Sequence, residues 1–237
     1  MKDQYASYTR DTKEPLKALA HSRRFRQAAA ILDTSHSDMV LDYGCADGHL
    51  FTHLHATPHQ RMVGYDPDTA LLAQRDDSLA NVTFFSDRQA LLKEFRGAFS
   101  VIACMEVCEH MTPAALREVL ETIIQLSAPD ARIIFGVPIE TGTSGFAKQL
   151  YRMSKGGRMG ASWSTACRAL ASLPIQRRMT DVEWYGDHTG FDDRLFALTL
   201  KSFGFVIDRV SYLPFRWLGR LLNNEVFYTC RYRPKAD

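Results

Sequence analysis

The chain has 237 residues, which suffice for one ordinary α/β domain with an added cap but not for two independent domains. Its formal net charge of +2 is much lower than a dedicated nucleic-acid binder usually carries, so we expect no nucleic-acid partner. The amino-terminal residues form no apolar signal core, and no apolar window approaches transmembrane length. The five cysteines lack a zinc-like C-x-x-C spacing, and we expect a cytoplasmic protein.

The first 35 residues are predicted to form an N-terminal helical cap. Residues 1–13 are polar, whereas residues 14–32 carry apolar side chains near helical spacing. This pattern predicts one or two helices that pack beside a sheet.

Residues 40–50 contain the most informative pattern, an apolar run with Asp42 near its end, a turn with Gly44 and Gly48, and a helix-compatible segment. In open α/β sheets, a strand, a tight loop and a helix in this order bind nucleotide-like ligands. A dinucleotide site would require G-x-G-x-x-G, whereas the spacing here is Asp-x-Gly-x-x-x-Gly. The Asp42 carboxylate would also repel a pyrophosphate. The ligand should therefore carry positive charge and no phosphate, which fits S-adenosylmethionine.

This loop resembles motif I of the class I S-adenosylmethionine-dependent methyltransferases, whose pattern is Asp/Glu-x-Gly-x-Gly-x-Gly. The resemblance implies that Asp42, Gly44, Cys45 and Gly48 contact the cofactor. Ala46 stands where the family has the middle glycine. Alanine is tolerated there if its φ is negative and is costly if its φ is positive.

A second strand is predicted over residues 61–65 and leads into Asp66, 24 residues after Asp42. In the family, the acid at this position accepts hydrogen bonds from both ribose hydroxyls, which a carboxylate does well. Pro67 follows it and is assigned to the same site. The alternative is a turn with an N-cap at Asp68 before the next helix. The two interpretations are compatible, because Asp68 can cap the helix while Asp66 binds.

A third strand, residues 82–85, leads into Asp87, where the family places an acid beside the exocyclic amine of adenine. The alternative is a Ser-Asp turn without a ligand. Residues 99–104 form a buried fourth strand. Met105 and Glu106, which follow it, are predicted to line the donor pocket.

Two histidines are the candidate bases on the acceptor side. His110 follows the fourth strand at the carboxyl edge of the sheet. In the alternative interpretation it has no role as a base, packs at the start of the next helix and forms a hydrogen bond with the backbone. His188 lies in a segment similar to one before the penultimate helix of the ubiquinone-biosynthesis O-methyltransferases. Its alternative is an exposed position beside a helix capped by Asp192 or Thr189. A base would polarise the proton of a hydroxyl acceptor, while alignment supplies most of the acceleration.

Glu106, Glu109 and His110 form a Glu-x-x-Glu-His segment similar to that of the same O-methyltransferases, where these residues are associated with a metal that activates a catechol hydroxyl. Two carboxylates and an imidazole within five residues can bind a divalent cation. The same letters also occur in relatives without a metal role. We predict that no metal is bound, with these three residues as the alternative ligand set.

Strands that alternate with helices predict a doubly wound parallel sheet. Five elements in family order cover residues 38–138, the last a strand that ends at Pro138. A helix at 192–202 is then followed by strands at 205–207 and 226–228. The resemblance implies an α/β Rossmann-like methyltransferase fold with a mostly parallel seven-stranded sheet whose last strand is antiparallel. The predicted parts of this single domain are an N-terminal helical cap (1–35), a cofactor-binding core (36–139), an inserted substrate cap (140–190) and a C-terminal completion of the sheet (191–237).

Residues 141–186 of the predicted cap contain seven cations and two acids, a local charge of +5. This charge is either a solvated face or an attraction for an anionic acceptor, such as a phosphorylated sugar, a nucleotide-sugar or a phospholipid-linked intermediate. Arg216 and Arg220 stand among apolar residues at 212–222. That segment is either core or an interfacial helix that touches a membrane or a partner transiently.

The sequence thus predicts methyl transfer from S-adenosylmethionine to a small molecule at oxygen. An RNA or protein methyltransferase is the first alternative, but Met105 and Glu106 stand where amino-methylating enzymes carry Asn-Pro-Pro-Tyr. A member of the fold that binds the cofactor without turnover is the second. The sequence predicts neither the acceptor itself nor the oligomeric state.

Overall fold

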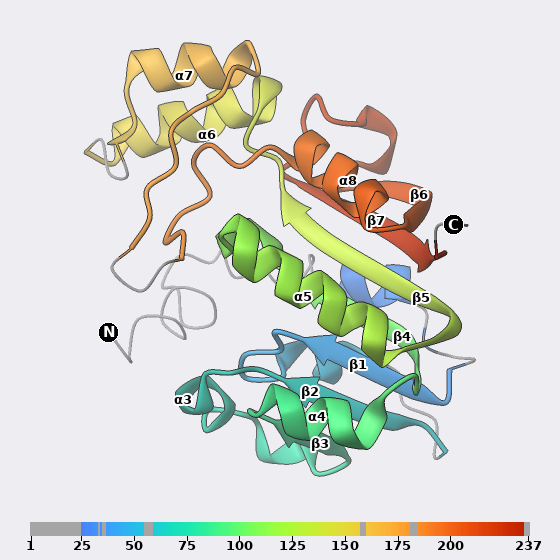
Figure 1. Cartoon of the computed structure of the whole chain (residues 1–237). Helices are drawn as coiled ribbons and strands as arrows, with labels where there is room; N and C mark the ends of the chain where they lie inside the picture. Colours follow the sequence, from blue (N-terminus) through green and yellow to red (C-terminus); the bar gives the residue numbers. More distant parts are fainter. Residues whose placement is uncertain are drawn as a thin grey trace.

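The computed structural model describes residues 25–32, 34, 37–54, 59–156, 160–180 and 184–234. Its centre is a seven-stranded sheet with the order β3-β2-β1-β4-β5-β7-β6 (Figure 1). The strands are β1 (Met39–Tyr43), β2 (Arg61–Tyr65), β3 (Val82–Phe85), β4 (Phe99–Met105), β5 (Ser127–Pro138), β6 (Phe205–Leu213) and β7 (Glu225–Tyr232). Only β7 pairs antiparallel with its neighbours, so the predicted mostly parallel sheet with an antiparallel last strand is confirmed.

Helices alternate with these strands. The α-helices are α3 (Thr69–Leu72), α4 (Arg88–Phe95), α5 (Pro113–Leu126), α6 (Gly142–Ser154), α7 (Trp163–Leu170) and α8 (Asp193–Ser202). The 3-10 helices are η1 (His49–His53), η2 (Asp77–Leu79), η3 (Cys108–His110) and η5 (Arg216–Leu218), and residues 25–32 are also helical. All the α-helices named here except α6 begin at a residue whose polar side chain accepts a backbone N–H, as Thr112 does from Ala115 at the start of α5.

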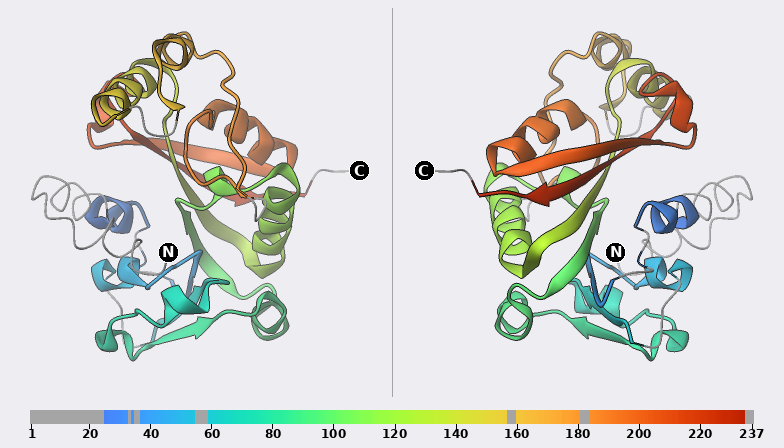
Figure 2. Two further views of the ribbon diagram at one scale, coloured as in Figure 1. Left: turned by 90° about the vertical axis from the view of Figure 1, so that its left-hand side faces the viewer. Right: turned by 90° about the vertical axis from the view of Figure 1, so that its right-hand side faces the viewer.

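Side chains alternate between the two faces of the sheet, and each face has its own helical layer. Leu41, Ile102 and Ile133 belong to the core cluster under α4, α5 and α8. Their neighbours Val40, Val101 and Ile134 belong to the opposite cluster, which includes residues 25–32 and η1. Figure 2 shows these two layers on opposite sides of the strands. This double coverage explains why the central strands read as continuous apolar runs.

Helices α6 and α7 lie beyond the carboxyl end of β5, within the predicted insertion (Figure 1). Gly145 of α6 permits their close approach. A Cβ at this position would lie 2.1 Å from the carbonyl oxygen of Glu140 and 3.3 Å from Cβ of Ala169 in α7. The two helices therefore pack against each other and against the chain that leaves β5.

The structure differs from the sequence predictions at three places. The segment after β1 is the short 3-10 helix η1 rather than an α-helix, and β5 begins at Ser127, six residues before the strand predicted at 133–138. The interfacial helix, one of the two alternatives for 212–222, does not form, because β6 continues to Leu213 through pairing with β7 and the loop beyond it contains only η5. Of the predicted N-terminal cap, residues 1–24 lie outside the described residues.

No helix in the described part of the chain combines the length and the apolar character needed to cross a bilayer.

Candidate active site

The carboxyl ends of β1, β2 and β3 bring the predicted cofactor acids to one edge of the sheet. Tyr43 pairs with Tyr65, which pairs with Phe85, so the loops after these residues start side by side. The Asp66 backbone N–H donates to the Phe85 carbonyl at 3.1 Å, which continues the ladder into the loop. Parallel strands make this edge the usual ligand crevice of an open α/β sheet.

Asp42 is the most perturbed acid at this edge. Its side chain is only 4% exposed, and burial, together with the nearby charges of Asp66 and Asp47, raises the pKa of Asp42 to about 7. A buried carboxyl of this kind gains free energy when a positively charged ligand group approaches, because the opposite charge favours its ionised form. The site therefore fits a cationic ligand.

The carboxylate of Asp66 is oriented by two backbone donors. Oδ2 accepts from the Ala46 N–H at 2.9 Å, and Oδ1 accepts from the Asp68 N–H at 2.8 Å. Burial is the main cause that raises the pKa of Asp66. Because each carboxylate oxygen can accept more than one hydrogen bond, capacity remains for hydroxyl donors. Asp68 caps α3 by accepting from the Ala70 N–H at 2.8 Å, so capping and an oriented Asp66 coexist.

The glycines of the motif are required by the backbone and by packing. Gly44 has φ of 84°, and a Cβ there would lie 2.3 Å from Cγ2 of Val107. Gly48 has φ of 76°, and its Cβ would lie 2.9 Å from the Phe84 ring. Cys45 is buried between the loop and the sheet, and burial raises the pKa of its thiol. This thiol is therefore a packing group rather than a nucleophile.

Ala46 adopts φ of 49° and thus occupies the left-handed region that an alanine enters at a cost. The departure from the motif pattern therefore falls where the family glycine is conformationally needed. Its N–H nevertheless makes the bond to Asp66, which holds the motif loop against the end of β2.

Asp87 and Pro67 lie on the outer side of the same edge, and both are exposed. Asp87 caps α4 by accepting from the Gln89 N–H at 2.8 Å. An exposed carboxylate in that position keeps a further lone pair for a ligand amine.

The loop after β4 carries a second strained residue. Glu106 has φ of 57°, and its N–H donates to the Gly136 carbonyl at 2.9 Å. Gly136 also makes room for Met105, because a Cβ on the glycine would lie 2.6 Å from the Met105 Sδ. Left-handed backbone at a glutamate is uncommon and is found most often at functional sites.

His110 and His188 meet although they are 78 residues apart. Their Nε2 atoms are 3.2 Å from each other. The Nδ1–H of His110 donates to the Tyr185 carbonyl at 2.7 Å, because a carbonyl can only accept. In the neutral pair, Nε2 of His110 therefore accepts and Nε2–H of His188 donates. Trp184 stacks on the His110 ring with centroids 4.9 Å apart.

Glu109 lies beneath this pair and is completely buried. Its Oε1 is 3.6 Å from Nε2 of His188 and 3.8 Å from Nε2 of His110. Burial is the main cause that lowers the pKa of His188. Ligand atoms of these three residues lie within 4.8 Å of one another, a separation at which one cation can be shared. This group differs from the sequence-based ligand set, because His188 takes the place of Glu106.

Two cations of the predicted cap, Lys148 and Arg152, form ion pairs with a buried acid of the same segment. Glu140 follows β5, is 1% exposed, and binds Lys148 at 2.9 Å and Arg152 at 2.8 Å. Burial alone would raise the pKa of Glu140, but the two cations outweigh it and hold that pKa below its usual value. Arg152 also donates to the Thr189 hydroxyl at 3.2 Å, which ties α6 to the neighbour of His188.

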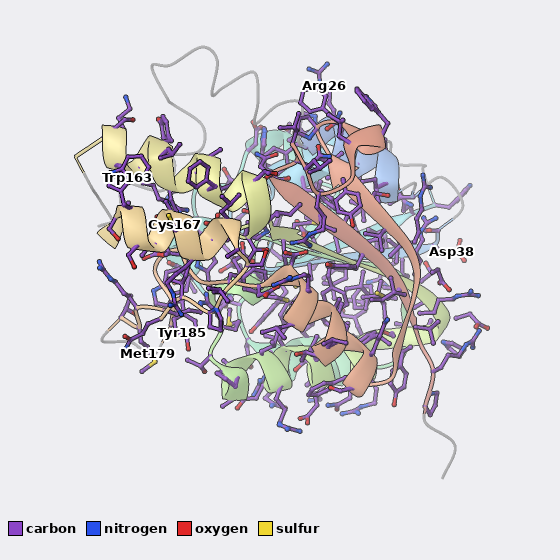
Figure 3. All side chains as sticks on the ribbon, turned by 90° about the horizontal axis from the view of Figure 1, so that it is seen from above. Arg26, Asp38, Trp163, Cys167, Met179 and Tyr185 are labelled. Carbon is purple, nitrogen blue, oxygen red and sulfur yellow. The ribbon has the colours of Figure 1, made fainter. Side chains whose placement is uncertain are left out.

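Sequence reasoning missed three residues that contact His110 or Glu109. Tyr185 binds His110 through both backbone groups, Trp184 stacks on it, and Arg177 donates to the Glu109 carbonyl. Figure 3 shows Tyr185 and Met179 close together below α7, where they form an isolated bridge. No local motif marks these residues, since their partners lie about 70 residues earlier in the chain.

Comparisons with known proteins agree with this geometry. The sequence model of the methyltransferase-domain family matches residues 13–192. A comparison with curated protein sequences finds no match. Among solved structures, the PH0226 protein from Pyrococcus horikoshii OT3 has a TM-score of 0.61 at 12% identity and covers 97% of this chain and 96% of its own.

Two further structures differ in their acceptors. The 1,6-didemethyltoxoflavin-N1-methyltransferase of Burkholderia thailandensis, solved with its acceptor and S-adenosylhomocysteine, has a TM-score of 0.59 at 18% identity, with 98% of this chain and 87% of that chain covered. The small RNA methyltransferase HEN1 has a TM-score of 0.58 at 17% identity, with 91% and 26% covered. At these identities the likeness shows the fold alone, whereas the family match spans most of the chain. The chain belongs to the methyltransferase-domain family and is a methyltransferase.

Proposed function

We propose that the protein transfers a methyl group from S-adenosylmethionine to a hydroxyl oxygen of a small molecule. The observation that carries this proposal is the His110–His188 pair, held over the buried Glu109 at the sheet edge where the cofactor acids also lie. The donor supplies an electrophilic methyl group on a sulfonium. The protein then has to align the acceptor with that methyl group and take up its proton.

The residues of the cofactor edge fit this donor. Asp42, Gly44, Cys45 and Gly48 would surround its methionine part, where the raised pKa of Asp42 suits a cationic partner. Of the remaining residues, Asp66 and Pro67 would lie at the ribose and Asp87 at the adenine. Met105 and Glu106 would line the wall of the pocket. Asp66 carries the firmest support, since its carboxylate is already oriented by two backbone N–H groups.

The histidine pair would serve as the general base. Because burial lowers the pKa of His188, its ring is neutral near pH 7 and can accept a proton. The Tyr185 carbonyl holds the tautomer of His110, so the proton of the acceptor would go to the unprotonated Nδ1 of His188, and the resulting His188 imidazolium would lie beside the Glu109 carboxylate. We assign residues 140–190 as the cap that covers the acceptor. We also propose that the protein works in the reducing cytoplasm, where its five free cysteines are stable.

A divalent cation held by Glu109, His110 and His188 is the second candidate for the acceptor side. It is favoured by the approach of the three ligand atoms to within 4.8 Å. Activity that is lost on treatment with a chelator and restored by magnesium or manganese would support the metal. Activity that is unchanged after chelation would support the two histidines as the general base without a metal.

The decisive experiment is a thermal-shift screen with S-adenosylmethionine and candidate phenols, sugars and lipid-linked acceptors, followed by turnover of the hits. RNA oligonucleotides belong in the same screen, because the HEN1 structure shares this fold. Methylation of RNA with no small-molecule turnover would overturn the proposal.

His188→Ala should then lower turnover by roughly 100-fold or more while the affinity for S-adenosylmethionine stays unchanged, as expected for a lost general base. His59→Ala is the matched control, since this exposed histidine precedes β2 at the opposite edge of the sheet. Full activity of His188→Ala would remove the histidine from the acceptor site.

A further inference from the structure

The loop between β6 and β7 exposes its apolar side chains to solvent. Trp217 is 83% exposed, and Leu221 and Leu222 are both more than 60% exposed. Phe215 is about half exposed in the same loop. Single exposed apolar residues are common on protein surfaces, but four large ones within eight residues form a patch that calls for a partner.

The polar groups of this loop point inward and hold its backbone. Asn223 is completely buried, and its side-chain amide donates to the carbonyls of Phe215 at 2.7 Å and Gly219 at 2.5 Å. Its Oδ1 accepts from the Phe215 N–H at 2.6 Å. Arg220 pairs with the buried Asp193 at 2.9 Å and donates to Thr141 at 2.8 Å. The loop is thus built by its polar residues, and the apolar ones are not needed to close it.

The loop lies at the carboxyl edge of the sheet, beside the acceptor side. Thr143 and Ser144 at the start of α6 donate to the carbonyls of Leu221 and Asn223. The carbonyl of Asn224, the residue before β7, accepts from Lys148 at 3.2 Å. Lys148 binds Glu140, and Glu140 also binds Arg152. Arg152 in turn donates to Thr189, the neighbour of His188. Figure 2 shows this loop next to the start of α6 in both views.

The charge around the loop favours an anionic partner. Residues 209–224 contain three arginines and no acid, although Arg220 is already paired with Asp193. The adjoining segment 140–186 carries a net +4 when Glu140, the partner of Lys148 and Arg152, is counted. Indole side chains favour the headgroup region of a bilayer, where one end is apolar and the other wet. Cations near an anionic leaflet add electrostatic attraction.

We propose that residues 214–222 form a membrane-docking loop, which inserts Trp217, Leu221 and Leu222 into the interface of an anionic phospholipid bilayer. Docking would hold the acceptor side of the enzyme at the membrane surface, within reach of a lipid-linked acceptor. The loop binds the bilayer peripherally, through apolar burial and charge together. This inference stands apart from the proposed chemistry, since vesicle binding requires no turnover.

The test is co-sedimentation of the full chain with vesicles of equimolar phosphatidylcholine and phosphatidylglycerol, compared with phosphatidylcholine alone. We expect binding to the anionic vesicles that weakens at high salt. The variant Trp217→Ser/Leu221→Ser should bind at least about tenfold more weakly, because two inserted side chains are lost. Its affinity for S-adenosylmethionine should match that of the wild type, which shows that it is folded.

The matched control is Trp163→Ser/Leu173→Ser, which removes a tryptophan and a leucine that are 66% and 50% exposed on and after α7 (Figure 3). This variant should bind vesicles as the wild type does. Wild-type protein that ignores anionic vesicles, or equal binding by both variants, would overturn the proposal. Self-association that the loop variant abolishes in the absence of lipid would assign the patch to a second copy of the chain and would also overturn it. If the double loop variant fails to fold, the single variant Trp217→Ser carries the same comparison.

Discussion

Two residues of the motif I loop show how far a local pattern constrains chemistry. Asp42 stands where a cofactor acid is expected, and its burial raises its pKa to about 7, which makes it sensitive to pH and to a cationic ligand. Ala46 replaces a glycine at a position whose φ of 49° suits glycine. Both residues act through backbone and solvation energies rather than through direct chemistry.

Ala46→Gly should stabilise the protein by up to about 1 kcal/mol, because relief of the left-handed strain exceeds the added freedom of the unfolded chain. Urea unfolding of the ligand-free protein measures this change. Gly44→Ala is the opposite control and should destabilise, since its Cβ would lie 2.3 Å from Val107. A destabilised Ala46→Gly variant would show that the alanine is not strained.

Asp42 should make the stability of the ligand-free protein fall as pH rises. Its folded pKa of about 7 lies above the ordinary value of 3.8 for an aspartate in water, so the folded state binds the extra proton at pH values between these two pKa values. The stabilisation is complete below about pH 4 and is lost by about pH 7, with an upper limit of about 4 kcal/mol. Asp42→Asn removes it, so the variant should gain stability relative to the wild type from pH 4 to pH 8. If the difference in unfolding free energy between Asp42→Asn and the wild type stays constant from pH 4 to pH 8, the raised pKa of Asp42 is contradicted.

At the scale of elements, the cap is joined to the sheet by buried charge. Glu140 at the end of β5 binds two cations of α6, and Arg152 extends the link to the segment of His188. Replacement of both partners of a buried ion pair often changes the free energy of unfolding little. Removal of one partner is costly, because it leaves the other charge buried without a counter-charge. The position of α6 relative to β5 and to the segment of His188 therefore depends on one carboxylate.

Glu140→Gln should lower the free energy of unfolding by about 3 kcal/mol, because Lys148 and Arg152 lose their buried counter-charge. Chemical denaturation at neutral pH measures the loss. Glu118→Gln is the matched control, since its 2.7 Å pair with Arg88 is partly exposed and should be worth less than about 1 kcal/mol. Equal losses in the two variants would mean that the buried pair has no special weight.

At the scale of the whole molecule, adjacent parallel strands bring the residues predicted to bind the cofactor to one edge of the sheet. A ligand that binds only the folded state stabilises it by mass action, by about 2.7 kcal/mol at a concentration of 100 times its dissociation constant. S-adenosylmethionine should therefore raise the melting temperature of the wild type.

Asp66→Ala should abolish most of this shift, because the carboxylate that Ala46 and Asp68 orient would be lost. Calorimetric titration gives the affinity directly. Asp68→Ala is the control, since it removes only the helix cap and should leave binding close to that of the wild type. Unchanged affinity in Asp66→Ala would remove the ribose assignment.

The sequence by itself determined the order of the strands and helices along the chain, the helix cap at Asp68 and the acids at the strand ends. These features rest on local periodicity and on side chains that bond within a few residues, so a short window contains their cause. It also carried the motif that identifies the family, because a glycine turn between a strand and a helix is local.

Only the tertiary structure decided how the acceptor side is built. The meeting of His110 with His188, and the contact of Tyr185 with His110, join segments more than 70 residues apart, and no local pattern encodes such a distance. The sign of φ at Ala46 and the loop in place of a helix at 214–222 were likewise decided by the packing around them. Long-range contacts select among conformations that the local sequence leaves close in energy, and for that reason the arrangement of His110, His188 and Glu109 forms only in the folded chain.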